Sequence, residues 1–72
     1  MNFSQALEAL KEGNMIKRKE WNGYWSIETY TIQKKVNHSI HSKMIVATFK
    51  GNTLPVSPTQ EEVLAEDWEI VK

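Results

Sequence analysis

The sequence predicts a small α+β domain, in which an N-terminal helix packs on a mostly antiparallel sheet of about five strands, with a second short helix before the last strand. The apolar residues follow a helical period at the N-terminus, and the period changes to two from residue 14 onward. No long crossover helix separates consecutive predicted strands, which favours antiparallel pairing. The 72 residues suffice for one domain, expected to span residues 1–72.

The first predicted element is a helix over residues 3–12. Its apolar side chains recur at i, i+3, i+4 and i+7 and therefore share one face. These side chains belong to Phe3, Ala6, Leu7 and Leu10. Asn2 can cap the helix, with Gln5 three residues later in the capping-box position. Gly13 follows in the position where a left-handed glycine commonly ends a helix.

The β-branched and aromatic residues that alternate with polar ones predict strands after this helix. The predicted strands cover residues 15–18, 24–32, 43–49, 53–56 and 68–71. In the second of these, Trp25 and Ile27 share one face and Tyr24 lies on the other. The stretch over residues 33–42 is polar and has no clear period, so we expect a loop there. The helix face should pack on this sheet over Trp68 and Ile70.

Turn and cap signals connect these elements. Asn22-Gly23 is typical of a two-residue type I′ hairpin turn, in which both central residues need a positive φ. Residues 50–52 predict a second turn between the third and fourth strands. The short second helix is predicted to begin with Ser57 as its N-cap and Pro58 as its first residue.

The composition excludes several classes of protein. Nine basic and nine acidic residues give a net charge of zero, so we expect no nucleic-acid partner held by phosphate attraction. The longest apolar run, around residues 44–47, is too short to span a bilayer, so no membrane partner is expected. The first residues lack the pattern of a signal peptide. These observations together predict a cytoplasmic protein.

The small size of the chain predicts a supporting partner. A domain of this length buries only about 60% of the surface that its unfolded chain exposes, so its core is thin. The sequence has no cysteine and can form neither disulfides nor thiolate metal sites. Oligomerisation is the remaining common support, and we therefore expect at least a homodimer.

The sequence offers weak evidence for catalysis or metal binding. His38 and His41 form an H-x-x-H pair, but no Cys, Asp or Glu lies close by to complete a zinc site. Ser42 or Ser57 could be combined with a histidine and Asp67 into a triad, yet no nucleophile-elbow motif supports one. The glycines are single residues in turns and form no phosphate loop. We expect no catalytic residue, no metal and no cofactor.

The segment RKEWNGYW concentrates aromatic residues around one turn. Tyr24 and Trp25 point to opposite sides of a strand, so these two and Trp21 cannot all fill one small core. Arg18 offers a planar fork suited to phosphate, and Asn22 offers an amide. Stacking, ion pairing and hydrogen bonding of this kind suit a nucleotide. Core or subunit packing of the same aromatic residues is the competing interpretation.

Three segments carry a family resemblance: MNFSQALEALKEG at the N-terminus, the arginine and WNG of RKEWNG, and LAEDWEIV near the C-terminus. They resemble a family of small phage and prophage proteins that includes the second Thoeris anti-defence protein. The resemblance implies a small α+β unit that assembles as a homotetramer with pockets shared between subunits. It also implies a molecular sponge in the bacterial host cell, which binds a cyclic nucleotide immune signal without cleaving it. The implied signal is a cyclic ADP-ribose isomer made by a TIR-domain enzyme.

The resemblance and the residue types together define an expected site, where the WNG hairpin of one subunit approaches the start of the second helix of another. We expect Trp21 to stack on the base and Arg18 to approach the pyrophosphate. Asn22 and Asp67 should hydrogen-bond base or ribose edges, and amides at the start of the second helix should offer an anion site. The expected ligand-binding residues are Arg18, Trp21, Asn22, Trp25, Thr59, Gln60 and Asp67.

Three other functions remain open from the sequence. The chain could be a homo-oligomeric structural or interaction module that contacts a host protein, a sponge for cyclic oligonucleotides, or an enzyme that degrades the nucleotide. Trp21 and Arg18 should be accessible near a pocket in a sponge, whereas they should lie in a dry interface in an interaction module.

Overall fold

The computed structural model describes the backbone of residues 1–34 and 38–72. It describes the side chains of residues 1–29 and 42–72. The elements are α1 (Phe3–Lys11), β1 (Ile16–Arg18), β2 (Tyr24–Lys34), β3 (His38–Phe49), β4 (Asn52–Pro55), α2 (Gln60–Leu64) and β5 (Trp68–Ile70). The predicted fold class is confirmed: an N-terminal helix, an antiparallel five-stranded sheet and a short helix before the last strand. The strand order is β4-β3-β2-β1-β5. Among the described residues, no helix is long and apolar enough to cross a membrane.

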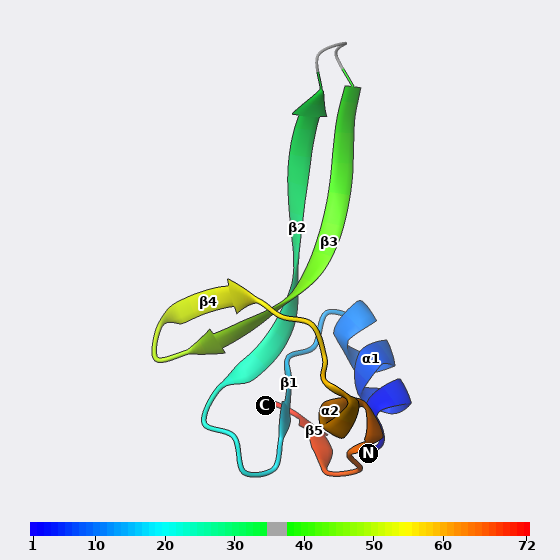
Figure 1. The fold of residues 1–72 in the computed structure, drawn as a ribbon, viewed down its shortest axis with the longest axis vertical. Coiled ribbons are helices and arrows are strands. Elements are labelled where there is room, and N and C mark those ends of the chain that lie inside the picture. Colours follow the sequence, from blue (N-terminus) through cyan, green and yellow to red (C-terminus); the bar gives the residue numbers. More distant parts are fainter. Residues whose placement is uncertain (35–37) are drawn as a thin grey trace.

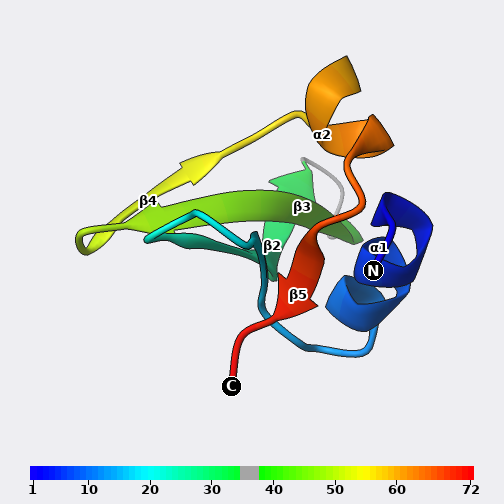
Figure 2. The same cartoon turned by 90° about the horizontal axis from the view of Figure 1, so that it is seen from below.

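The sheet has a compact body and a long two-stranded arm (Figure 1). In the arm, β2 and β3 pair with each other from Tyr24↔Thr48 to Lys34↔His38. The flanking strands cover only the base of this ribbon, since β1 reaches β2 at Trp25 and β4 begins to pair with β3 at Val46. In the body, α1 lies close to β5, on the side away from β4 (Figure 2). The arm explains why the longest dimension is 45 Å and the others are 26 and 23 Å.

The arm corrects the loop predicted over residues 33–42. Both ends of that stretch belong to strands, because β2 continues to Lys34 and β3 begins at His38. Residues 35–37 lie outside the described part of the chain. This stretch is polar and its apolar residues do not alternate with polar ones, so the pattern that indicates a strand is missing there.

The start and end of α1 are formed as predicted. The backbone amide of Gln5 donates to Asn2 Oδ1 and the amide of Asn2 donates to Gln5 Oε1, both at 2.9 Å, which completes a capping box. After the helix, Gly13 has a φ of +97°, a left-handed conformation that favours glycine. The amide of Gly13 donates to the carbonyl of Leu10 at 3.0 Å, so the end of the helix is satisfied.

The type I′ turn predicted at Asn22-Gly23 is wrong. Neither residue has a positive φ, whereas Lys50 and Gly51 have φ values of 51° and 81° in the two-residue turn between β3 and β4. Gly23 is required for a different reason. A Cβ atom on it would lie 2.5 Å from the carbonyl oxygen of Thr48, so the absence of a side chain allows the close approach to β3.

The predicted N-cap of the second helix is also wrong, because the helix is capped by Thr59 and not by Ser57. Glu62 Oε1 accepts from the amide of Thr59 at 2.8 Å, and the amide of Glu62 donates to Thr59 Oγ1 at 3.2 Å. This reciprocal pair satisfies two helix-end donors.

The core joins α1 to the sheet. The buried cluster consists of Ala6, Ala9, Leu10, Ile16, Trp25 and Trp68. Phe3 packs on Trp68 with ring centroids 5.6 Å apart, which confirms the expected contact between the helix and the last strand. Leu7 is partly buried, and Ile70 at the edge of the sheet keeps 39% of its surface exposed. The expected position of Trp68 is therefore correct, but Ile70 is not covered.

Candidate ligand-binding site

Three tryptophans from distant parts of the chain form one aromatic cluster. The ring centroids of Trp21, Trp25 and Trp68 lie 5.1 to 5.2 Å apart, at tilted or edge-on angles. Such arrangements stabilise aromatic pairs beyond the area that they bury. Trp25 and Trp68 are 4% and 2% exposed, but Trp21 lies at the margin of the cluster and is only partly buried. The cluster therefore has one ring that can also contact solvent or a ligand.

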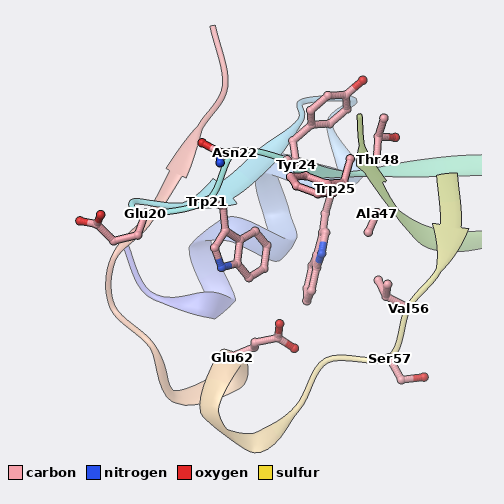
Figure 3. A pocket seen from close by; sticks show the side chains of 12 residues that line it. Glu20, Trp21, Asn22, Tyr24, Trp25, Ala47, Thr48, Val56, Ser57 and Glu62 are labelled. Atoms are coloured by element: carbon pink, nitrogen blue, oxygen red, sulfur yellow. The ribbon is translucent and has the colours of Figure 1, made fainter. Parts of the chain in front are cut away.

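A cavity of about 580 Å³ opens beside this cluster (Figure 3). It is lined by residues 20–25 in the loop before β2 and at its start, by residues 47–49 at the end of β3, by residues 56–57, and by Glu62 of α2. The size falls within the range of small-molecule sites. Because β2 and β3 leave the body here, the base of the arm forms one wall of the cavity (Figures 1 and 3).

The lining combines flat apolar surfaces with a few polar groups. The indoles of Trp21 and Trp25 stand side by side, and the carboxylate of Glu62 faces them from α2 (Figure 3). Glu20 points away from the cavity in the same view. The described lining includes no lysine, arginine or histidine. Such a site can stack a planar group and accept hydrogen bonds from it.

Arg18 and Asp67, both predicted to bind the ligand, bind each other. Arg18 Nε donates to Asp67 Oδ1 at 2.8 Å and Nη2 donates to Oδ2 at 3.4 Å, while Nη1 lies 3.6 Å from Glu61 Oε1. This hydrogen bond lowers the pKa of Asp67 and raises the pKa of Arg18 from their ordinary values. The pair joins β1 to the segment before β5, and neither residue lines the cavity.

Lys17 organises the loop that presents Trp21. Its Nζ donates to the backbone carbonyls of Arg18, Lys19 and Trp21 at 3.2, 3.1 and 3.1 Å. The same ammonium lies 3.2 Å from Glu69 Oε1 on β5. This role could not be predicted from the sequence, since a lysine in a short strand is ordinarily a surface residue and nothing in its spacing marks it.

The predicted site residues divide into three groups. Trp21, Asn22 and Trp25 line the cavity, although Trp25 is mostly enclosed by the core. Arg18 and Asp67 form the ion pair outside it. Thr59 caps α2 and Gln60 is its first residue. The amide of Thr59, which was expected to bind an anion, already donates to the side chain of Glu62. The assignment of all seven residues to a ligand stays a prediction.

The sequence analysis did not assign the wall formed by β3 or the carboxylate of Glu62 to the site. One signal could have placed part of this wall: in an antiparallel hairpin, the register that pairs Tyr24 with Thr48 also brings Phe49 beside the turn at residues 22–23. For Glu62 the signal was the Thr-x-x-Glu pattern of a capping box, which fixes the direction of the carboxylate.

Comparison with known proteins assigns the chain to a family. A model of the Tad2-like family, described as the Thoeris anti-defense 2-like domain, matches residues 1–71. The chain is similar to Thoeris anti-defense 2 of Bacillus phage SP01, with 30% identity over an 84-residue alignment that covers 99% of this chain and 94% of the relative. Both findings support an anti-defence role. The chain belongs to the Tad2-like family of Thoeris anti-defense 2-like domains.

Proposed function

We propose that this protein is an anti-defence sponge that binds a cyclic nucleotide immune signal, a cyclic ADP-ribose isomer made by a TIR-domain enzyme, and sequesters it without cleavage. The observation that carries the proposal is the cavity beside Trp21. One indole is partly open to this cavity while its neighbours are held in the core. A nucleobase can stack on such a fixed ring at the cost of little further ordering, with a gain of roughly 1–3 kcal/mol.

The composition of the lining supports binding without turnover. Thr48 and Ser57 bring hydroxyl groups to the cavity, but the described lining has no histidine, cysteine or lysine beside them, and the carboxylate of Glu62 already accepts a hydrogen bond from the amide of Thr59. A hydroxyl is a weak nucleophile until an adjacent base activates it. The family membership, which supports an anti-defence role, is consistent with a protein that removes a signal from solution by holding it.

We also propose that the functional form is a homo-oligomer, a tetramer according to the resemblance. Leu54 on β4 and Leu64 on α2 are 66% and 77% exposed, and Phe49 is 48% exposed. Apolar residues of this size on a small chain with a thin core support burial against further copies. In the oligomer, the ion-paired Arg18 and the start of α2 would approach the cavity of a neighbouring copy.

The same exposed leucines favour one other function, an interaction module that binds a host protein. Binding and recovery of the signal separates the two. The protein is incubated with a cyclic ADP-ribose isomer, separated from free ligand, and denatured, and the released molecule is identified by mass spectrometry. A sponge releases the intact isomer in stoichiometric amount. Release of a linear product would establish an enzyme. If the protein retains no ligand, the interaction module remains as the function.

A further inference from the structure

Glu62 has the features of a carboxylate held in place for a purpose beyond capping α2. Its backbone carbonyl accepts from the indole Nε1 of the buried Trp68 at 2.9 Å. Its side-chain Oε1 accepts from the amide of Thr59 at 2.8 Å. Two contacts therefore fix both the backbone and the carboxyl group, and the second of them uses only one oxygen.

The carboxyl group of Glu62 has one oxygen left to accept a further hydrogen bond. The carboxyl group faces the indoles of Trp21 and Trp25 across the cavity (Figure 3). No hydrogen bond or ion pair of the described residues involves its Oε2 atom. An ionised carboxylate is a hydrogen-bond acceptor only, so a ligand group that pairs with it must donate a hydrogen bond.

The charge of the cavity lining determines whether the base or the phosphates of a nucleotide can enter. The carboxylate of Glu62 faces the cavity and the described lining has no cationic side chain, so a phosphate deep in the cavity would lie near a like charge with no compensating partner. A described cation next to the lining is Lys50, whose Nζ lies 5.4 Å from the centre of the Phe49 ring in the turn after β3. The base therefore enters and the phosphates remain at the rim.

We propose that Glu62 is a specificity-determining residue that accepts a hydrogen bond from the exocyclic amino group of a purine stacked on Trp21. This inference rests on the proposed function, and it names the feature that the cavity selects. An amino-purine presents an N–H donor to the carboxylate, whereas an oxo-purine presents a carbonyl oxygen at the same position and leaves two acceptors facing each other. Sites built for a hydrogen bond reject analogues that lack it much more strongly than sites of apolar contact.

The test compares two ligands that differ only at this position. One is a cyclic ADP-ribose isomer closed through its two riboses, so that adenine keeps its amino group, and the other has hypoxanthine in place of adenine. Isothermal titration at equal salt should show at least roughly tenfold tighter binding of the adenine ligand by the unmodified protein. In Glu62→Gln this preference should fall severalfold, since a side-chain amide can both accept and donate.

Both variants used in the test should keep the fold of the unmodified protein. Glutamine is also a capping-box residue, so Glu62→Gln should retain the contact with Thr59. Glu61→Gln is the matched control, because it removes one negative charge from the same helix at a residue that is 85% exposed and outside the cavity lining. This control should keep the full preference for adenine.

The outcomes separate the inference from the proposed function. Equal binding of the two ligands by the unmodified protein, or an unchanged preference in Glu62→Gln, would overturn the role of Glu62 while leaving sequestration intact. A loss of preference in Glu61→Gln as large as in Glu62→Gln would also overturn it, since net charge would then be the cause. Failure of the unmodified protein to bind either ligand would overturn the proposed function as well.

Discussion

The tryptophan cluster has a closed side and an open side, and the two sides have different neighbours. On the closed side, Trp68 is 2% exposed and packs on Phe3 of α1, and Trp25 is only 4% exposed although one part of it lines the cavity. On the open side, Trp21 packs on the same two rings but also faces the cavity. The neighbours of an indole, and not its residue type, therefore decide whether it stabilises the fold or can contact a ligand. Stability and binding should therefore respond to different substitutions.

The largest expected effect lies on the closed side. Leu10 is 1% exposed, so Leu10→Ala should lower the free energy of unfolding by about 2–5 kcal/mol, which is most of the stability of a domain this small. Lys11→Ala shortens a side chain of the same helix that is 59% exposed. Chemical denaturation should find this variant within about 0.5 kcal/mol of the unmodified protein. Equal losses in the two variants would show that Leu10 is not buried between α1 and the sheet.

A smaller loss is expected where the two sides meet at the base of the arm. In Gly23→Ala the new Cβ would lie 2.5 Å from the carbonyl oxygen of Thr48, so the strands must separate, at a cost of about 1–3 kcal/mol. Gly51→Ala is the control for backbone strain alone, because its positive φ disfavours alanine but no atom lies within 4 Å of the new Cβ. Thermal unfolding should rank Gly23→Ala below Gly51→Ala. The reverse order would contradict the close approach to β3.

On the open side, Lys17 should affect binding more than stability. Lys17→Met removes the donor that joins three carbonyls of the Trp21 loop, so the ring should lose its fixed position and the affinity for a cyclic ADP-ribose isomer should fall roughly tenfold. The near-ultraviolet circular dichroism of the indoles should weaken in the same variant. Lys19→Met, in the same loop but exposed, serves as the control. Unchanged affinity in Lys17→Met would remove the positioning role.

The smallest expected effect is the dependence of stability on pH at the Arg18–Asp67 pair. Because the pKa of Asp67 is lowered in the folded protein, its contribution is present above the unfolded pKa of about 4 and is lost as the pH falls through the folded value. Asp67→Asn should therefore be less stable than the unmodified protein at neutral pH, with the difference shrinking below about pH 4. Denaturation curves measured across this range would contradict the assignment if the difference grew toward low pH.

Local patterns predicted most of the fold. The capping box of Asn2 and Gln5, the left-handed Gly13 and the order of the elements are all as expected. The outer end of the arm was predicted as a loop, although residues 33–34 and 38–42 belong to its strands, because that polar stretch shows no clear period. The cap at Thr59 was missed because two overlapping cap signals lie close together, and only the contact geometry decides between them.

The candidate site was predictable only in part. The aromatic residues around the WNG turn pointed to the correct region, since Trp21 and Asn22 line the cavity. The partner of Arg18 could not be inferred, because Asp67 lies 49 residues away and no local pattern connects them. Glu62 lines the cavity because α2 lies beside the core. The indole Nε1 of Trp68 donates to the backbone carbonyl of Glu62 and helps to hold α2 there.

The central claim is that Trp21 serves the ligand while its two neighbours serve the fold, and Trp21→Ala tests it most directly. Light scattering gives the oligomeric state of this variant, and isothermal titration with a cyclic ADP-ribose isomer gives its affinity. We predict that binding is lost, that Trp21→Phe retains part of it because a ring remains for stacking, and that the oligomer stays intact in both variants. A Trp21→Ala protein that separates into monomers, or that binds the isomer as tightly as the unmodified protein, would contradict the claim.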